Sequence, residues 1–306
     1  MTKFESDPAF RRGEAAIDID ALRRWIGREE TRTDIVTAAP IAALAATLDR
    51  DDPPPQAGDA VPPLWHWLFF LHAARASEIG LDGHPTRGGF LPPVPLPRRM
   101  WAGGRLVFER PLRVGGAVTR TSRIADVSVK HGKGGPLVFV QVAHTITNSD
   151  GLLLLSEEHD IVYRDKPSPE LTTPTQTTPT QATSTKRAPA EYAWSREIVP
   201  DPVLLFRYSA LTFNGHRIHY DVKYVTDVEG YGGLIVHGPL IATLLADLLR
   251  RNLANARLTK FEFRAIKPLF DTAPFLVRGL PHGQRVALWA QDRDGDLCME
   301  ATAEIG

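Results

Sequence analysis

The chain has 306 residues, of which 43% are hydrophobic and 24% charged, an ordinary balance for a globular protein with a sizeable core. Lysine plus arginine and aspartate plus glutamate each total 36, so the formal net charge is zero. This balance leaves no basic field for nucleic acid or an anionic membrane, and we expect neither as a partner. The single cysteine, Cys298, excludes a disulfide framework and a cysteine-rich metal site. With a polar N-terminus and only short apolar runs, the sequence indicates a cytoplasmic protein.

The first half begins with helical patterns and continues with strand patterns. Apolar spacing predicts helices over residues 17–28 and 37–48. The apolar and aromatic segment 64–71 fits either a buried strand or the start of a helix, because periodicity does not separate the two. Residues 105–164 carry strand signals broken by glycine-rich turns and an Asn-Ser-Asp-Gly turn, which predicts an antiparallel meander.

A proline-rich stretch lies between these patterns, over residues 79–104. It contains the run LPPVPLPRRMWAGG and has no clear helix or strand period. One interpretation is a surface crossing with no further role. The other is a lid or channel wall, in which Arg98 and Arg99 contact phosphate and Trp101 stacks on a ligand.

The composition changes sharply at residues 166–190, which are dominated by threonine, proline and glutamine. Such a segment buries too little apolar surface to offset the entropy of ordering it, so we interpret it as a flexible linker. It divides the chain into an N-terminal unit, 1–165, and a C-terminal unit, 191–306.

The C-terminal unit has a similar order of elements. A strand is expected over 192–200, a short helix over 202–210 and a longer helix over 239–252. Four strand-like segments follow from residue 258 to the end.

Two short signatures occur once in each half. Phe108–Leu112 (FERPL) corresponds to Ile266–Leu269 (IKPL), and the Asp150-Gly151 turn corresponds to Asp294-Gly295. The sequence therefore predicts an α+β unit that is duplicated, each copy a helix wrapped by an antiparallel sheet, with the two sheets side by side.

The most unusual stretch combines a polar turn with a glycine-rich approach and a helix start. The turn carries Asn214, His216 and His219, and the helix starts at His237-Gly238-Pro239. Such an arrangement can place a base opposite free backbone N–H groups, which suits a carbonyl whose oxygen becomes negative during a reaction. The alternative is a loop, a buried strand and a capped helix with no chemistry.

These residues resemble the signature of MaoC-like (R)-specific enoyl-CoA hydratases. The run Thr212–His219 (TFNGHRIH) corresponds to the Ser-Gly-Asp-x-Asn-Pro-x-His turn of that family, and Val236–Gly238 (VHG) to its apolar-His-Gly helix start. The upstream run PLPRRMWAGGRLVFERPL is similar to the branch that contains mesaconyl-C4-CoA and itaconyl-CoA hydratases and mitochondrial-type 3-hydroxyacyl-thioester dehydratases. The resemblance implies a double hot-dog fold.

The resemblance also implies roles for three residues. His219 matches the catalytic histidine, Asn214 stands where most members carry the catalytic aspartate, and Gly238 matches the oxyanion-hole glycine. An amide cannot exchange a proton near neutral pH but can hold a water, so the acid–base work is expected of His219. The N-terminal unit lacks such a turn, which implies that it accommodates a bulky acyl or CoA portion.

Further residues of the stretch have two interpretations each. His216 and Arg217 either contact a substrate carboxylate or pack the turn, and Tyr231 and Gly233 are expected to shape the approach to the pocket. His237 is more typical of a satisfied buried histidine. No acidic or cysteine ligand joins the three histidines at a familiar spacing, so we expect no metal.

The expected activity is reversible hydration of a short α,β-unsaturated acyl-CoA, with a dicarboxylic mesaconyl-C4-CoA or itaconyl-CoA type favoured and no cofactor besides the CoA thioester itself. Three alternatives remain: an acyl-CoA thioesterase that would use Asp221, a 3-hydroxyacyl-thioester dehydratase of fatty acid synthesis, and a degenerate acyl-CoA-binding subunit. A homodimer is the expected assembly.

Overall fold

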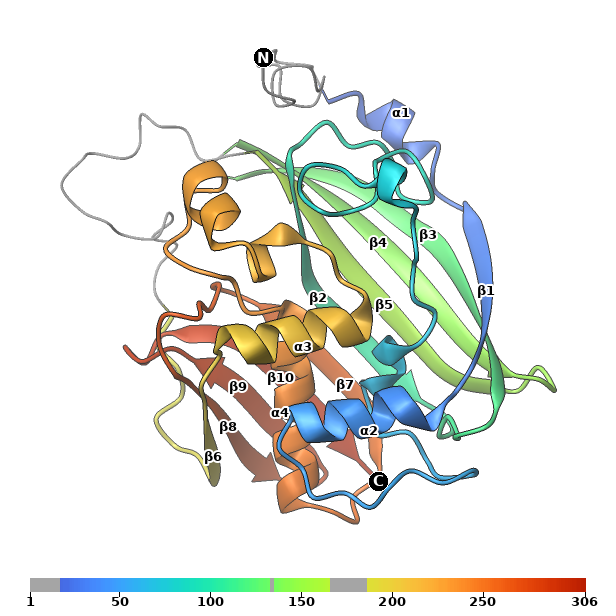
Figure 1. The fold of residues 1–306 in the computed structure, drawn as a ribbon, viewed down its shortest axis with the longest axis vertical. Coiled ribbons are helices and arrows are strands. Elements are labelled where there is room, and N and C mark those ends of the chain that lie inside the picture. The colour runs from blue at the N-terminus through green and yellow to red at the C-terminus, as the bar shows by residue number, and fades with distance from the viewer. Residues whose placement is uncertain (1–16, 133–134, 166–185) are drawn as a thin grey trace.

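A single antiparallel sheet of ten strands organises the molecule (Figure 1), and the computed structural model describes residues 17–132, 135–165 and 186–306. The strand order is β1-β3-β4-β5-β2-β7-β10-β9-β8-β6. The strands of the first half are β1 (Glu29–Ile35), β2 (Arg98–Phe108), β3 (Ala117–Gly132), β4 (Gly135–Asn148) and β5 (Leu153–Arg164). Those of the second half are β6 (Trp194–Ile198), β7 (Leu258–Ala265), β8 (Phe275–His282), β9 (Arg285–Gln291) and β10 (Leu297–Ile305).

The two halves of the sheet have the same topology. From the outer edge inward, the order β1-β3-β4-β5-β2 matches β6-β8-β9-β10-β7. The halves join where β2 and β7 pair, with Arg105 opposite Glu262 and Leu106 opposite Phe261. This order confirms the predicted repetition of one strand pattern and the side-by-side pairing of the two sheets.

The helices are unequal in length and burial. They are α1 (Ile19–Arg23), α2 (Ala38–Thr47), α3 (Pro202–Thr212) and α4 (Gly238–Asn252), with the 3₁₀ turns η2 (Trp65–Leu68), η3 (Ala76–Glu78) and η5 (Arg217–His219) and the π-helical turn η6 (Tyr224–Val228). Helix α4 is buried from Leu240 to Leu249 and packs on β6, β8, β9 and β10. A proline in its first turn and Arg250 and Arg251 in its last favour its two ends.

The first half has no helix equivalent to α4 in the described part of the chain, which corrects the expectation of a helix wrapped by each sheet. Helix α2 packs chiefly against α3 and η2 instead of crossing the strands. Figure 1 shows α2 and α3 in front of the sheet and α4 behind them. The aromatic segment around η2 is buried instead, with Trp65, Leu68 and Phe69 in the main core cluster.

Three local predictions were wrong or incomplete. Helix α1 is shorter than predicted, and residues 29–35 form the edge strand β1, which pairs with β3. Segment 64–71 is neither a strand nor a long helix but the single turn η2, which starts after Leu64 at a φ of 70°. Residues from Arg98 onward belong to strand β2 rather than to a loop. The helices predicted over 37–48, 202–210 and 239–252 are confirmed.

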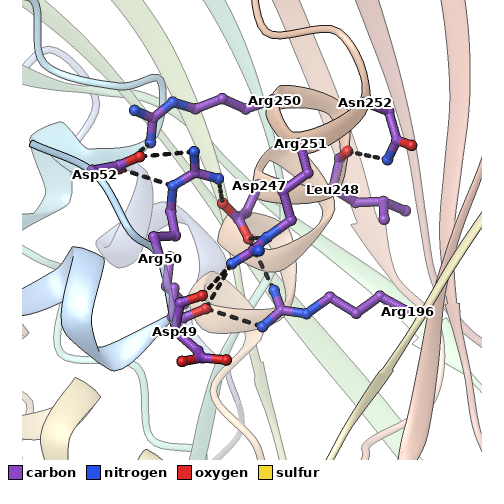
Figure 2. Close-up of polar contacts among 10 residues, drawn as sticks. Asp49, Arg50, Asp52, Arg196, Asp247, Leu248, Arg250, Arg251 and Asn252 are labelled. Atoms are coloured by element: carbon purple, nitrogen blue, oxygen red, sulfur yellow. Dashed lines mark hydrogen bonds and ion pairs between the residues drawn. The ribbon is translucent and has the colours of Figure 1, made fainter.

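A buried ion cluster joins the first half to the far end of α4 (Figure 2). The Asp247 carboxylate, buried within α4, accepts hydrogen bonds from Arg50 at 2.6 Å, Arg196 at 2.9 Å and Arg251 at 2.7 Å. Arg50 follows α2, so one carboxylate ties α2, β6 and α4 together. Buried charges are stable only when they are paired in this way.

The expected linker falls largely outside the described residues, at 166–185. Its last residues are described, and there Arg187 pairs with Asp296 at 3.1 Å while the Ala188 N–H donates to the Gly295 carbonyl. The division into units 1–165, 166–190 and 191–306 stays a prediction. Among the described helices, none is long and apolar enough to cross a membrane.

Candidate active site

The polar turn follows directly from the way α3 ends. Phe213 adopts a left-handed conformation with φ of 51°, and the next N–H, that of Asn214, donates to the Ser209 carbonyl at 2.8 Å. The Asn214 side-chain oxygen then accepts the His216 N–H at 3.0 Å. This bond fixes the orientation of the amide, so that its NH₂ is the group left to hold a water or substrate.

His219 is buried at the end of turn η5, and its ring is held by one backbone contact. Its Nδ1 lies 2.7 Å from the Ile235 carbonyl oxygen. A carbonyl can only accept, so Nδ1 carries the proton of the neutral ring and Nε2 keeps a lone pair. Burial lowers the pKa of His219 to about 4, although the Ile235 contact acts in the opposite direction. The ring is therefore a neutral base at physiological pH.

Gly238 opens α4 beside this ring. Within the described residues its N–H donates no hydrogen bond, as expected for the first N–H groups of a helix. The positive end of the helix dipole adds to its attraction for a negative oxygen. Gly238, His219 and Asn214 line one cavity of about 640 Å³.

His237 supports the His219 ring from behind. The two rings stack with centroids 3.7 Å apart and an angle of 18°. His237 is fully buried, and its Nε2 lies 2.8 Å from the Ser209 hydroxyl, while its Nδ1 has no partner among the described groups. The expectation of a satisfied buried histidine therefore holds for only one of the two nitrogens. Burial holds the pKa of His237 well below its usual value.

A loop from the first half completes the wall of the cavity. The Asp82 carbonyl accepts the Arg217 N–H at 2.9 Å, and Gly83 lies against Gly215 so closely that a Cβ on Gly83 would be 1.8 Å from the Gly215 oxygen. This contact places the ring centroids of His84 and His216 4.1 Å apart. Sequence reasoning missed Asp82 and His84; the Asp-Gly turn in the proline-rich stretch was the available signal.

Four histidine rings thus form a row. His84 faces His216, the His216 ring centroid lies 5.5 Å from that of His219, and His219 stacks on His237. Asp82 ends the row, with Oδ2 3.2 Å from Nδ1 of His84. The row runs from the first half of the chain into the start of α4.

Two other predicted substrate-binding residues, Arg98 and Tyr231, line the same cavity but are engaged with each other. Arg98 pairs with Glu229 at 2.8 Å and lies over the Tyr231 ring at 4.8 Å. The Tyr231 hydroxyl accepts from Arg164 at 3.0 Å. Arg98 therefore shapes the wall and is not free to bind a phosphate.

Arg217 and Gly233 do not line the catalytic cavity. They also do not line a second, larger cavity that adjoins the polar turn. Arg217 pairs with Asp221 at 2.7 Å, which also occupies the carboxylate that a thioesterase would need. Gly233 allows Asp271 to approach, since a Cβ there would lie 2.6 Å from the Asp271 carboxylate. These contacts give both positions a structural role, and substrate binding by them stays a prediction.

Arg99 and Trp101 line the catalytic cavity of about 640 Å³ and also the larger cavity, of about 1130 Å³. Asn214 and His84 lie on both walls, so the two cavities meet at the polar turn. Residues of the proline-rich stretch therefore line both cavities, and its role as a lid or channel wall stays a prediction. Trp101 packs on His159 with ring centroids 3.9 Å apart.

Beneath Trp101 lies a buried polar network of the first half. Glu157 accepts from Trp67 at 2.8 Å and contacts His159 at 2.5 Å and His66 at 3.0 Å. Burial acts to raise the pKa of the Glu157 carboxyl, but the neighbouring His159 and His66 hold it well below its ordinary value. The carboxylate is therefore ionised and held inside the protein.

One group of side chains has the composition of a metal site. Asp82, His84 and His216 offer ligand atoms that lie within 4.8 Å of one another. The sequence expectation of no metal considered His216, His219 and His237 and did not foresee an acidic group from the other half. The positive charge of Arg99 acts on all three groups and works against a cation at this place.

Comparison with known proteins agrees with this geometry. A model of the family described as hydroxyacyl-thioester dehydratase type 2 matches residues 64–271. The chain is 46% identical to mesaconyl-C(4)-CoA hydratase of Chloroflexus aurantiacus over 92% of this chain and 97% of that protein. It is 28% identical to the mitochondrial hydroxyacyl-thioester dehydratase type 2 of Schizosaccharomyces pombe over 80% of this chain and 87% of that protein.

Solved structures show the same fold at low sequence identity. A MaoC-like dehydratase from Phytophthora capsici superposes with a TM-score of 0.66 at 14% identity, covering 95% of this chain and 99% of that one. A Mycobacterium tuberculosis protein described as a double hot dog gives a TM-score of 0.55 at 13% identity, over 94% and 98% of the two chains. These likenesses confirm the expected α+β double hot-dog fold.

Proposed function

Because the chain belongs to the hydroxyacyl-thioester dehydratase type 2 family, we propose that it is a hydro-lyase that adds water reversibly to a short α,β-unsaturated acyl-CoA. The product is the 3-hydroxyacyl-CoA. A short dicarboxylic acyl group of the mesaconyl-C4 or itaconyl type is the favoured substrate, by similarity to the Chloroflexus hydratase. The observation that carries the proposal is the neutral His219 ring, fixed at Nδ1 by Ile235, beside Asn214 and the unpaired Gly238 N–H.

The reaction needs one base, one water-holding group and one oxyanion donor. The Asn214 NH₂ donates to the water oxygen, and Nε2 of His219 accepts a water proton as the oxygen attacks the β-carbon. The imidazolium formed then delivers that proton to the α-carbon, so the ring returns to its neutral form. General acid–base catalysis of this kind contributes about 10²–10⁴-fold to the rate.

The thioester oxygen gains negative charge as the new C–O bond forms. The Gly238 N–H, at the positive end of α4, donates to this oxygen. A single oxyanion donor typically contributes about 10²–10³-fold. The acid–base and oxyanion groups all belong to the C-terminal unit.

The N-terminal unit supplies space rather than catalytic groups in this proposal. Its residues make up most of the wall of the larger cavity, which adjoins the reaction site at Asn214 and His84. That volume suits the CoA portion of the thioester. No step of the proposed reaction uses a metal or a further cofactor.

The test follows the enoyl absorbance of mesaconyl-C4-CoA, itaconyl-CoA and crotonyl-CoA with a thiol reagent in parallel. We expect absorbance loss without thiol release, and a loss of about 10²–10⁴-fold in kcat for His219→Ala. His131→Ala, an exposed histidine of the β3–β4 hairpin, is the matched control. Thiol release would instead identify a thioesterase, and unchanged hydration by His219→Ala would refute the assigned base.

A further inference from the structure

Arg99 is a cationic side chain on the wall of the cavity, and its charge acts on the Asp82 carboxylate without forming an ion pair with it. Its guanidinium forms no ion pair and donates no hydrogen bond to any group in the described ranges, although the residue is half-buried on the walls of both cavities. The other cations of the catalytic cavity are engaged: Arg98 with Glu229, Arg164 with the Tyr231 hydroxyl, and Lys267 with Asp292 and Asp296. A partly desolvated, unpaired guanidinium is costly unless an anion joins it.

The charge of Arg99 is directed toward the outer end of the histidine row. Burial lowers the pKa of His84 and of His216, and the Arg99 charge lowers both further. Asp82 is the negative group nearby, but its carboxylate is already engaged by the side chain and the N–H of His84. The Arg99 charge helps to lower the pKa of Asp82, so this carboxylate offsets the charge in part, but without an ion pair.

His216 lines the catalytic cavity together with Arg99 and the base His219. Its backbone N–H is bound to Asn214, and its ring nitrogens have no partner among the residues that the structure describes. Its ring centroid is 5.5 Å from that of the base His219. A neutral imidazole can donate one N–H to a carboxylate, and a guanidinium can donate two in parallel.

We propose that Arg99 and His216 form the subsite for a free carboxylate carried by the acyl group, at or next to its β-carbon. In a four-carbon dicarboxylic thioester this carboxylate is attached to the carbon that water attacks, so its subsite must adjoin the base, as His216 does. Asp82 and His84 position His216 from the far side. The inference rests on the proposed function and adds the residues that select the substrate class.

Binding of saturated thioesters tests the subsite without depending on hydration. Succinyl-CoA and butyryl-CoA have the same chain length, and only the first carries the carboxylate. Calorimetric titration of the wild-type protein should give a clearly lower Kd for succinyl-CoA. In Arg99→Met the succinyl-CoA Kd should rise about 30- to 1000-fold, as for a charged partner removed from a buried pair, and the preference should disappear. Arg99→Lys, which retains the charge but not the fork, should recover part of it.

Arg105→Met is the matched control, because Arg105 lies on the same strand, outside both cavities, and pairs with Glu158 and Asp160. It should keep the wild-type ratio of the two Kd values. Equal binding of both thioesters by the wild type, or an unaltered ratio in Arg99→Met, would overturn the subsite even if mesaconyl-C4-CoA is hydrated. Loss of the ratio in Arg99→Met together with no hydration of any enoyl thioester would refute the proposed function and leave the subsite intact.

Discussion

Matching positions in the two halves of the sheet carry residues of different size and charge. Across the central seam Leu106 pairs with Phe261. The next strand outward on each side places Glu157 opposite Leu106 and Ala303 opposite Phe261. In the second half, the small Ala303 is fully buried in the core cluster that includes α4. In the first half, the position carries a buried carboxylate bound by His66, Trp67 and His159.

This difference shows how a repeated unit can take on two tasks. In the second half, the small Ala303 belongs to a strand on which the long helix α4 packs, and this helix presents the Gly238 N–H at its start. Where a charged residue takes that place, aromatic and histidine side chains gather around it and no long helix is described. The first half therefore offers a wall and a cavity, while the second offers the proposed catalytic groups.

The largest effect is expected from removing the charge that distinguishes the first half. Glu157→Gln leaves His66 and His159 without their carboxylate, and breaking such a buried pair costs about 3–5 kcal/mol of unfolding free energy. Urea denaturation followed by tryptophan fluorescence measures this loss. Glu158→Gln is the control, since its carboxylate is nearly half exposed and its pair with Arg105 should contribute less than about 1 kcal/mol. Equal losses of unfolding free energy in both variants would mean that the buried Glu157 network stabilises the fold no more than the exposed Glu158 pair does.

A somewhat smaller effect is expected from removing the oxyanion donor of the second half. Gly238→Pro deletes one N–H at a position where proline fits the first turn of a helix and where the preceding His237 already has an extended ψ of 129°. We expect kcat to fall about 10²–10³-fold with the fold retained. Gly238→Ala keeps the N–H, and its Cβ would meet only the Trp101 oxygen, at 3.6 Å, so it should lose much less. A smaller loss in the proline variant than in the alanine variant would exclude the proposed donor.

The smallest effect is a shift of the acid limb of the rate profile. The base form of His219 is neutral and persists above its pKa of about 4, so kcat/KM should stay flat from pH 7 to pH 5 and fall by half near pH 4. A histidine with an ordinary pKa would lose half of its rate near pH 6.5. Because the unfolded chain binds this proton more tightly, stability also declines as the pH falls below about 6.5, and fluorescence must show a folded protein at each point. A midpoint near 6.5 in the folded protein would mean that His219 is solvated and not buried.

Much of the architecture could be predicted from local patterns. The α4 segment has an uninterrupted apolar stripe behind Gly-Pro, and the strands of both meanders are separated by glycine turns. Edge strand β1 could not be found in this way, because its sequence EETRTDI has no apolar alternation and only its pairing with β3 makes it a strand. The turn residues Asn214 and His219 stood in one short motif and could be named as candidates. For the neighbours His84 and Asp82 the sequence signals only an Asp-Gly turn, and a contact between distant loops places them at the site.

The contact between Gly83 and Gly215 also limits the substitutions that the protein can accept at these two positions. A Cβ on Gly83 would lie 1.8 Å from the Gly215 oxygen, and one on Gly215 would lie 2.8 Å from the Gly83 oxygen. Each loop therefore limits which residues the other can carry at the contact, although the two loops belong to different halves of the chain. A deep mutational scan scored for activity should tolerate only glycine at positions 83 and 215, one on each side of the threonine-rich segment. At this contact, therefore, neither half of the chain can change its sequence independently of the other.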